Sequence, residues 1–233
     1  MCAGRHGFSH PLSGIGIKRE TSLYSPVFSN CETYKLQIWR FFYNFAQTLS
    51  VIIMEFVRII DGYDHLWAVK SPHEEVDELT LLFRSWNNGE FLFDFFMENF
   101  DDLKDFFRIE RIEEAVSDTF DDADVLQELI LDFPYTENLD ELFKPLGLND
   151  SRTRELSREK ARNWNRNRHA SWLRIYAIRL DPNVYVVTGG AIKLTRTMQE
   201  RAHTMEQLDR LNRCKAYLKA NGVFDRDSFV ELI

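Results

Sequence analysis

Two apolar runs around a short turn form the clearest pattern in the chain. Residues 172–194 hold both runs, which are rich in β-branched and aromatic side chains, and Asp181-Pro182-Asn183 separates them. This pattern predicts two antiparallel strands joined by a hairpin. Apolar and polar positions alternate over residues 173–176, which predicts one buried face and one face open to solvent. Gly189-Gly190 in the second run predicts a bulge or a close approach by another backbone.

A second hairpin is predicted near residues 55–70, with the turn signal Asp61-Gly62-Tyr63-Asp64 between its strands. Apolar spacing and stop signals predict helices over residues 72–86, 90–102, 109–132 and 204–220, and a helical turn over residues 139–143. Ser71-Pro72 is expected to open the first helix, and the capping-box pattern Thr204 to Gln207 to open the last. The fold class is therefore α+β: a small antiparallel sheet packed with an acidic helical region and a C-terminal helix.

Residues 1–53 differ from the rest of the chain. Residues 1–30 are rich in Gly, Ser, Pro and His, which predicts disorder. Residues 36–53 are apolar and aromatic, but Arg40, Asn44 and Gln47 interrupt them, so we expect no membrane anchor. Ordered patterning starts at Met54, and we favour the hypothesis that the native protein starts there. Peptides from before Met54 in mass spectrometry of the native protein would contradict it.

Residues 54–233 are then expected to form a single α+β domain, with a helical insert at 72–133 and a basic part at 139–222. The net charge of −8 is divided between these parts. Residues 54–150 hold 26 acidic and 7 basic side chains, whereas residues 151–233 hold 9 and 17. This division indicates that the basic part meets an anion or that the two parts meet each other.

Several kinds of site are not indicated. The three cysteines, Cys2, Cys31 and Cys214, lie in no zinc-binding or disulfide pattern, which favours a reduced, cytoplasmic protein. The acidic run from Asp121 to Asp124 lacks the glycine and the terminal glutamate of a calcium loop. We therefore expect no metal ion and no cofactor.

Basic and aromatic side chains alternate between residues 151 and 180, where nine Lys and Arg accompany two Glu. This composition is typical of phosphate contact combined with base stacking. The candidate nucleic-acid-binding residues are Lys160, Arg162, Arg166, Arg168 and Trp172. A solvated basic loop, or a surface that pairs with the acidic helices, explains the same composition, and both interpretations stay open.

Residues 139–220 resemble the RelE/HigB-like superfamily of toxins from toxin–antitoxin pairs. The resemblance rests on Lys144-Pro145-Leu146, on Leu173 to Tyr176 with the following strand that ends at Lys193, and on a polar link to the helix at Thr204. The link after Lys193 is longer than in that family, and the helical region is larger and more acidic. The chain is also similar to proteins of gut Bacteroidota, which adds no mechanism.

The resemblance implies an endoribonuclease that cleaves messenger RNA without a metal ion, usually on the ribosome, or otherwise inhibits translation. It implies RNA or the ribosome and a cognate antitoxin protein as partners. Arg174 and Arg196 are then expected to stabilise phosphate charge, Lys193 to do the same or act as a base, His203 to protonate the leaving oxygen, and Tyr176 to stack or transfer a proton. Each of these side chains also has a structural interpretation, in the core, in an ion pair or in solvent.

A non-catalytic interaction module is the alternative, with an acidic helical face that binds a basic or nucleic-acid-binding partner. The two functions predict different surfaces. A toxin needs a concave basic site that contains Arg174, Lys193 and His203. An adaptor would neutralise these residues with carboxylates from residues 109–128.

Overall fold

The computed structural model describes residues 54–132, 139–147, 156–164 and 169–233. The chain divides into two compact units, Met1–Ile52 and Ile53–Ile233, and the fold below is that of the second. The expectations for residues 1–53, and those for Arg166 and Arg168, concern positions outside the described residues.

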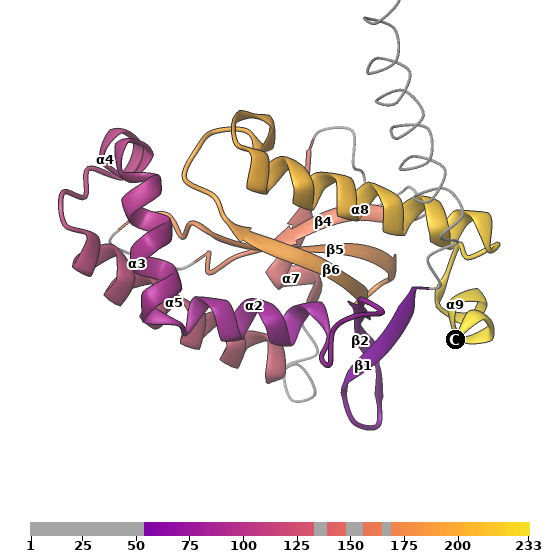
Figure 1. The fold of residues 1–233 in the computed structure, drawn as a ribbon. Helices are drawn as coiled ribbons and strands as arrows, with labels where there is room; N and C mark the ends of the chain where they lie inside the picture. Colours follow the sequence, from indigo (N-terminus) through magenta and orange to yellow (C-terminus); the bar gives the residue numbers. More distant parts are fainter. Residues whose placement is uncertain (1–53, 133–138, 148–155, 165–168) are drawn as a thin grey trace, which may run out of the picture. The chain divides into compact units, whose positions relative to one another are not determined.

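Six strands form one sheet in the order β1-β2-β6-β5-β4-β3 (Figure 1). The strands are β1 (Glu55–Ile60), β2 (Tyr63–Lys70), β3 (Phe143–Pro145), β4 (Ser157–Ala161), β5 (Leu173–Asp181) and β6 (Val184–Ile192). All neighbours are antiparallel except β2 and β6, which are parallel. The α+β fold class and both predicted hairpins are confirmed, and the sheet is larger than expected because β3 and β4 extend it.

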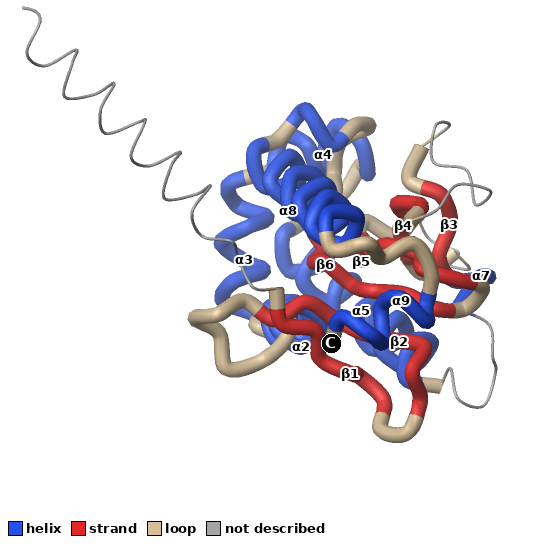
Figure 2. The backbone as a smooth tube through the Cα atoms, turned by 90° about the vertical axis from the view of Figure 1, so that its right-hand side faces the viewer, coloured by secondary structure: helices blue, strands red, loops and turns tan. Residues whose placement is uncertain are grey.

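Helices cover both faces of the sheet, as Figures 1 and 2 show. One face carries α2 (Glu78–Trp86), α3 (Gly89–Glu98), α4 (Phe100–Phe107), α5 (Ile112–Leu131) and α7 (Leu139–Leu142). The other carries α8 (Ala202–Ala220), which follows the 3-10 turn η1 (Met198–Glu200), and α9 (Arg226–Leu232). The expectation of a strand face open to solvent is therefore wrong for the central hairpin. All nine residues of β6 are buried, because apolar side chains of α8 pack on the second face.

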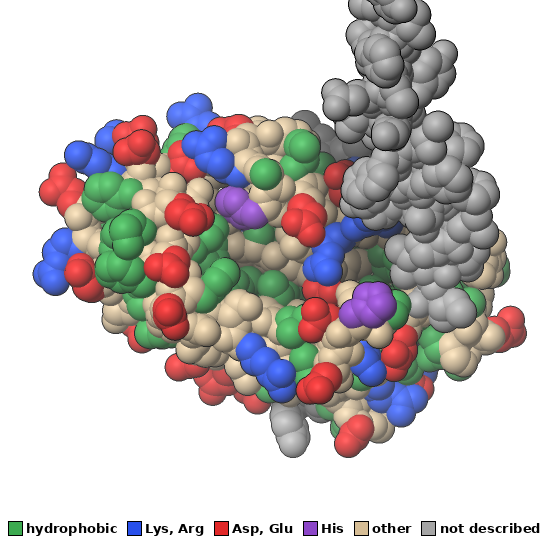
Figure 3. Space-filling model, in the orientation of Figure 1, with side chains coloured by type: hydrophobic (Ala, Val, Ile, Leu, Met, Phe, Trp, Pro, Cys, Tyr) green, Lys and Arg blue, Asp and Glu red, His purple; other side chains and the backbone are tan. Residues whose placement is uncertain are grey.

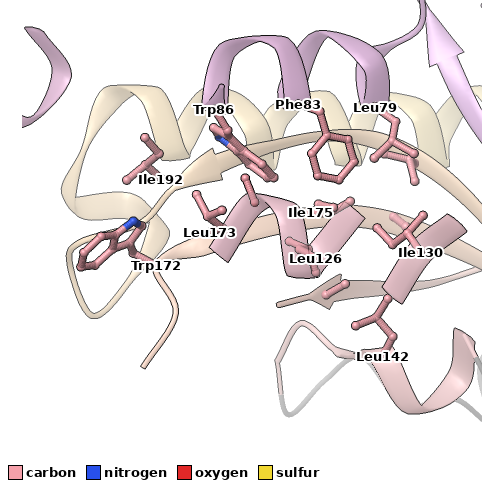
Figure 4. Packing of buried hydrophobic residues seen from close by; sticks show 14 of the residues in the cluster. Leu79, Phe83, Trp86, Leu126, Ile130, Leu142, Trp172, Leu173, Ile175 and Ile192 are labelled. Atoms are coloured by element: carbon pink, nitrogen blue, oxygen red, sulfur yellow. The ribbon is translucent and has the colours of Figure 1, made fainter. Parts of the chain in front are cut away.

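The larger core lies between the sheet and α2, α3 and α5. Figure 4 shows Trp86 and Phe83 of α2 near Leu126 of α5 and Leu173 and Ile175 of β5. Burying a large apolar side chain of this kind contributes about 1.5–3 kcal/mol. The apolar stripes predicted for these helices thus fix the sheet from one side, while Leu211, Cys214 and Leu218 of α8 fix it from the other.

A bulge in β6 confirms the prediction made from Gly189-Gly190. Tyr176 pairs with Gly189 and Ala177 with Val187, so Thr188 is the extra residue. A Cβ at Gly189 would collide with the side chain of Gln207, and one at Gly190 with the Arg174 carbonyl and Leu82. The two glycines let α8 and α2 approach the sheet closely from opposite sides.

Two helix starts differ from the prediction. The first helix begins at Glu78, not at Ser71-Pro72, because Asp77 Oδ1 accepts hydrogen bonds from the amides of Leu79 and Thr80, both at 3.0 Å. Helix α8 begins at Ala202. Thr204 lies inside it, and its hydroxyl donates to the carbonyl of Met198 at 2.6 Å instead of capping.

The region predicted as one helix over residues 90–102 forms two. Helix α3 ends at Glu98 and α4 begins at Phe100, with Asn99 between them. The Asn99 side chain donates to the Phe95 carbonyl at 2.8 Å, and this bond satisfies an acceptor at the end of α3.

Candidate functional site

Strand β4 builds one side of the candidate site. Its burial alternates, with Ser157, Glu159 and Ala161 buried and Arg158 and Lys160 half-buried. Successive side chains of a strand point to opposite faces, so the two basic residues share the face that also carries Tyr176, which pairs with Lys160. This is the face covered by α8, and Arg158 donates to Asn212 of that helix at 2.7 Å.

A cavity of about 630 Å³ opens on this face, between β4, β5, the segment around η1, and α8. Six basic residues line it: Arg158, Lys160, Arg162, Arg174, Lys193 and Arg196. The other lining residues are Leu146, Gly147, Trp164, Tyr176, Thr197, Met198, Gln199 and Leu208. No carboxylate belongs to this set of described residues, so the cavity concentrates positive charge in a protein whose net charge is negative.

Arg174 lies on β5, and two nearby backbone carbonyls hold its side chain. Its Nη1 donates to the carbonyls of Ser171 and Leu173, both at 2.6 Å. Burial first and the charge of Arg162 next lower the pKa of Arg174 to about 10, against smaller opposite effects of Tyr176 and Asp122. The guanidinium therefore stays charged at neutral pH in a partly desolvated position, where its attraction for an anion is stronger than in water.

Lys193 follows the last residue of β6. Its Nζ donates to the carbonyls of Thr195 at 2.5 Å and Arg196 at 2.6 Å. Burial lowers the pKa of Lys193 to about 8, and the charge of Arg174 contributes next. An ammonium group has three donors, so one remains for a ligand after these two bonds.

Tyr176 lies two residues after Arg174 on β5, and its hydroxyl is buried with no hydrogen-bond partner among the described residues. Burial raises the pKa of this phenol to about 12, so it is a proton donor and not a base at neutral pH. An unsatisfied buried hydroxyl costs about 1–3 kcal/mol. A ligand oxygen or a water molecule in the cavity is the natural acceptor for it.

Three basic residues of the cavity differ from other arginines of the described chain in their partners. Arg179, Arg201 and Arg210 each form an ion pair with a carboxylate, from Asp140, Asp102 and Glu78 respectively. Arg174, Lys193 and Arg196 form no such pair with any described residue. Arg196 is exposed at the rim of the cavity.

Four of the five predicted catalytic residues line this cavity, and His203 does not. His203 Nε2 lies 3.0 Å from the Ile192 carbonyl oxygen. The imidazole ring packs nearly perpendicular to the Phe95 ring, with 5.3 Å between the ring centroids. These contacts fix the first turn of α8 against β6 and α3. His203 is therefore placed as a structural residue, away from the reacting position that the sequence suggested.

Of the candidate nucleic-acid-binding residues, Lys160 and Arg162 line the cavity, whereas Trp172 does not. Trp172 is fully buried, its Nε1 donates to Thr119 Oγ1 at 3.0 Å, and its ring stacks on His169 at 4.3 Å. A side chain in this position offers no ring face to a base. The indole ring packs in the core, and its single N–H donor is already hydrogen-bonded to Thr119.

Sequence reasoning did not single out Arg158 and Trp164 as site residues, although both line the cavity. The signal for Arg158 was present in the sequence, because Arg158, Lys160 and Arg162 follow one another at every second position. Three charged side chains at this spacing share one face of a strand. No strand was predicted in this segment, so the spacing was not used.

Carboxylates of α5 contact residues of the basic segment that do not line the cavity, and the charge of Asp122 also acts on Arg174. Asp118 Oδ2 lies 3.0 Å from His169 Nε2, and Asn163 donates to Asp122 Oδ1 at 3.1 Å. Asp118 and Asp122 are buried, although both are acidic. The described residues contain no cluster of three potential metal ligands.

Comparisons with protein-family models, with curated proteins and with solved structures found no match to this chain. Within the described residues, no helix has the length and apolar character needed to cross a membrane. The functional argument therefore rests on the cavity itself.

Proposed function

We propose that the cavity binds the phosphodiester backbone of RNA and cleaves it without a metal ion, as a RelE/HigB-like toxin does. The observation that carries the proposal is the convergence of six basic side chains, with no carboxylate among the described residues that line the cavity. A chain of phosphates is the biological anion that best matches several cations placed along one cavity. The proposal includes a cytoplasmic location, action on translated RNA, and an antitoxin protein that covers the site.

The cavity residues suit the three tasks of RNA cleavage. The 2′-hydroxyl must lose its proton and attack phosphorus, the phosphorane charge must be stabilised, and the 5′ oxygen must gain a proton as its bond to phosphorus breaks. Lys193, with a pKa of about 8, is neutral in a minor fraction at neutral pH and is then able to accept the first proton. Arg174 and Arg196 stabilise the phosphorane, and the Tyr176 hydroxyl supplies a proton to the leaving oxygen.

The products would be a 2′,3′-cyclic phosphate and a 5′-hydroxyl end. The test is incubation of the purified full chain with end-labelled RNA in the presence of EDTA, followed by separation of the fragments. Arg196→Ala removes an exposed cavity cation and should reduce both binding and cleavage at least tenfold. Arg213→Ala removes an exposed cation of α8 that does not line the cavity, and it should behave as wild type. Equal activity of the two variants would contradict the proposal.

A second candidate is supported by the surface of α3 and α4. Figure 3 shows apolar side chains among acidic ones on this face, and Phe91, Phe93, Met97 and Phe106 are exposed. Residues 78–131 hold 15 acidic and 4 basic side chains, so the face suits a basic partner protein. Two results together would favour this interaction function over RNA cleavage. The chain would neither bind nor cleave RNA, and any effect of its expression on growth would be lost in Met97→Glu but kept in Lys193→Ala.

A further inference from the structure

One wall of the cavity is formed by two planar groups, a guanidinium and an indole ring, and phosphate binding does not require the indole. The Arg162 guanidinium lies over the Trp164 ring, 4.1 Å from its centroid, and both side chains line the cavity. Trp164 is 37% exposed, whereas the other described tryptophans, Trp67, Trp86 and Trp172, are buried. Indole rings and guanidinium planes are the two protein surfaces on which nucleobases stack most readily.

Trp164 is held in place before any ligand binds. Its Nε1 donates to the Leu142 carbonyl at 2.7 Å, where α7 meets β3. The indole donor is thus satisfied by a contact on the edge of the ring, while Arg162 covers one of its two faces. A ring fixed in this way loses little conformational entropy when a base packs against it.

The stacking wall and the phosphate-binding residues belong to one cavity. Arg162 continues the alternation of β4 and lies close enough to Arg174 for its charge to lower the pKa of that side chain. Arg174, Lys193 and Arg196 are held by β5 and by the segment after β6, and Arg162 and Trp164 come from the end of β4. A nucleotide is a ligand with one charged end and one planar end, and the cavity offers a matching surface for each.

We propose that Arg162 and Trp164 form a nucleobase-stacking subsite, which receives one unpaired base of an RNA strand while Arg174, Lys193 and Arg196 hold the adjacent phosphate. This inference rests on the proposed function, because it names the part of RNA that the same cavity recognises. In a duplex the faces of the bases are already covered by their neighbours, so only an unpaired base reaches the wall. The cavity therefore selects single-stranded RNA, with little preference for base identity because every base has a stacking face.

The size of the cavity agrees with this assignment. A volume of about 630 Å³ lies in the range of pockets, about 300–1,000 Å³, that enclose one small molecule or one group of a larger one. One nucleotide unit fits such a space, whereas an RNA duplex does not enter it. A duplex is then limited to contacts with the exposed rim, of which Arg196 is a part.

The test measures the fluorescence anisotropy of a labelled 12-nucleotide oligouridylate and of a labelled 12-base-pair RNA duplex, each titrated with the full chain. We expect the single strand to bind at least tenfold more tightly than the duplex. Trp164→Ala should weaken binding of the single strand by about 5- to 100-fold and leave binding of the duplex unchanged. Trp164→Phe keeps a stacking ring and should recover most of the lost affinity.

Arg162→Lys is the second variant, since it keeps the charge and removes the planar group. It should weaken single-strand binding several-fold with an unchanged dependence on salt, and it does not disturb the indole contact with Leu142. If wild type binds neither RNA, both this inference and the proposed function fail. If wild type binds both RNAs equally, or if Trp164→Ala and Arg162→Lys bind the single strand as wild type does, the subsite is wrong and the proposed function stands.

Discussion

The charge of Arg174 lowers the pKa of Lys193, and both side chains line the same cavity from adjacent strands of the sheet. Arg174 lies on β5, and Lys193 directly follows the end of β6. The two cations repel each other, and the opposite effect of the Glu200 carboxylate on the pKa of Lys193 is smaller. A bound phosphate removes this repulsion, which is why the pair favours an anionic ligand.

RNA affinity should depend on pH through Lys193. Its pKa in the free protein is about 8, lowered by burial first and by Arg174 next, so below that pH the ammonium is charged and available to phosphate. Above pH 8 the neutral Lys193 amine must take up a proton before it can pair with a phosphate. The dissociation constant for RNA should therefore rise as the pH goes from 7 to 9. Binding measured at constant salt over this range checks the prediction.

Lys193→Arg provides the control for that pH dependence. An arginine keeps its charge throughout the range, so the affinity of this variant should stay nearly constant between pH 7 and 9. The role of Lys193 is wrong if wild-type affinity does not change over this range. It is also wrong if the variant loses affinity in parallel with wild type.

Tyr176→Phe should separate stability from activity. The Tyr176 hydroxyl is buried without a described partner, so its removal relieves a cost of about 1–3 kcal/mol. We expect the free energy of unfolding to remain equal or to increase, while the rate of RNA cleavage falls at least tenfold. Urea unfolding and single-turnover cleavage check the two parts, and a clear loss of stability would show that the hydroxyl is bonded in the native protein.

Asp118→Ala should destabilise the protein because it removes the partner of His169. Both side chains are nearly buried, and their contact joins α5 to the segment that enters β5. We expect a loss of about 1–3 kcal/mol in the free energy of unfolding. Asp121→Ala, at an exposed position of the same helix, should stay within about 0.5 kcal/mol of wild type. Similar values for the two variants would argue against a structural role of the Asp118 contact.

Gly190→Ala should destabilise the sheet, because the added methyl group would collide with the Arg174 carbonyl and with Leu82. Overpacking of this kind costs about 1–3 kcal/mol. Gly89→Ala is the matched control, since the nearest atom to its added methyl group is Phe120 Cζ at 3.6 Å, an ordinary contact. Thermal unfolding of both variants distinguishes the close approach in β6 from a general effect of replacing glycine.

The elements with strong apolar patterns were predictable from the sequence, and those made of charged residues were not. The two hairpins and the main helices follow from apolar spacing, because their buried side chains recur at the period of a strand or a helix. Strand β4 has the sequence Ser-Arg-Glu-Lys-Ala, and its pairing with β3 and β5 depends on contacts that are distant in sequence. Tertiary pairing therefore decided its structure against its polar composition.

The candidate site was predictable only in part, for a related reason. Arg174 and Tyr176 were found because they lie two residues apart on a strong strand, and they share one face. Trp172 lies outside the cavity, because composition does not tell whether an aromatic ring packs in the core or remains exposed, and Trp164 has the exposed position instead. His203 also lies outside the cavity, in contact with Ile192 and Phe95, which are distant from it in sequence.

The dependence of RNA affinity on salt tests most directly whether cavity cations meet phosphates. Each phosphate contact with a single strand contributes about 0.7 to the slope of the logarithm of affinity against the logarithm of salt concentration. Arg196→Ala should reduce the slope by about that amount, while Arg213→Ala, outside the cavity, should leave the slope as in wild type. Identical slopes for wild type and Arg196→Ala, or an equal reduction in both variants, would contradict phosphate binding in this cavity.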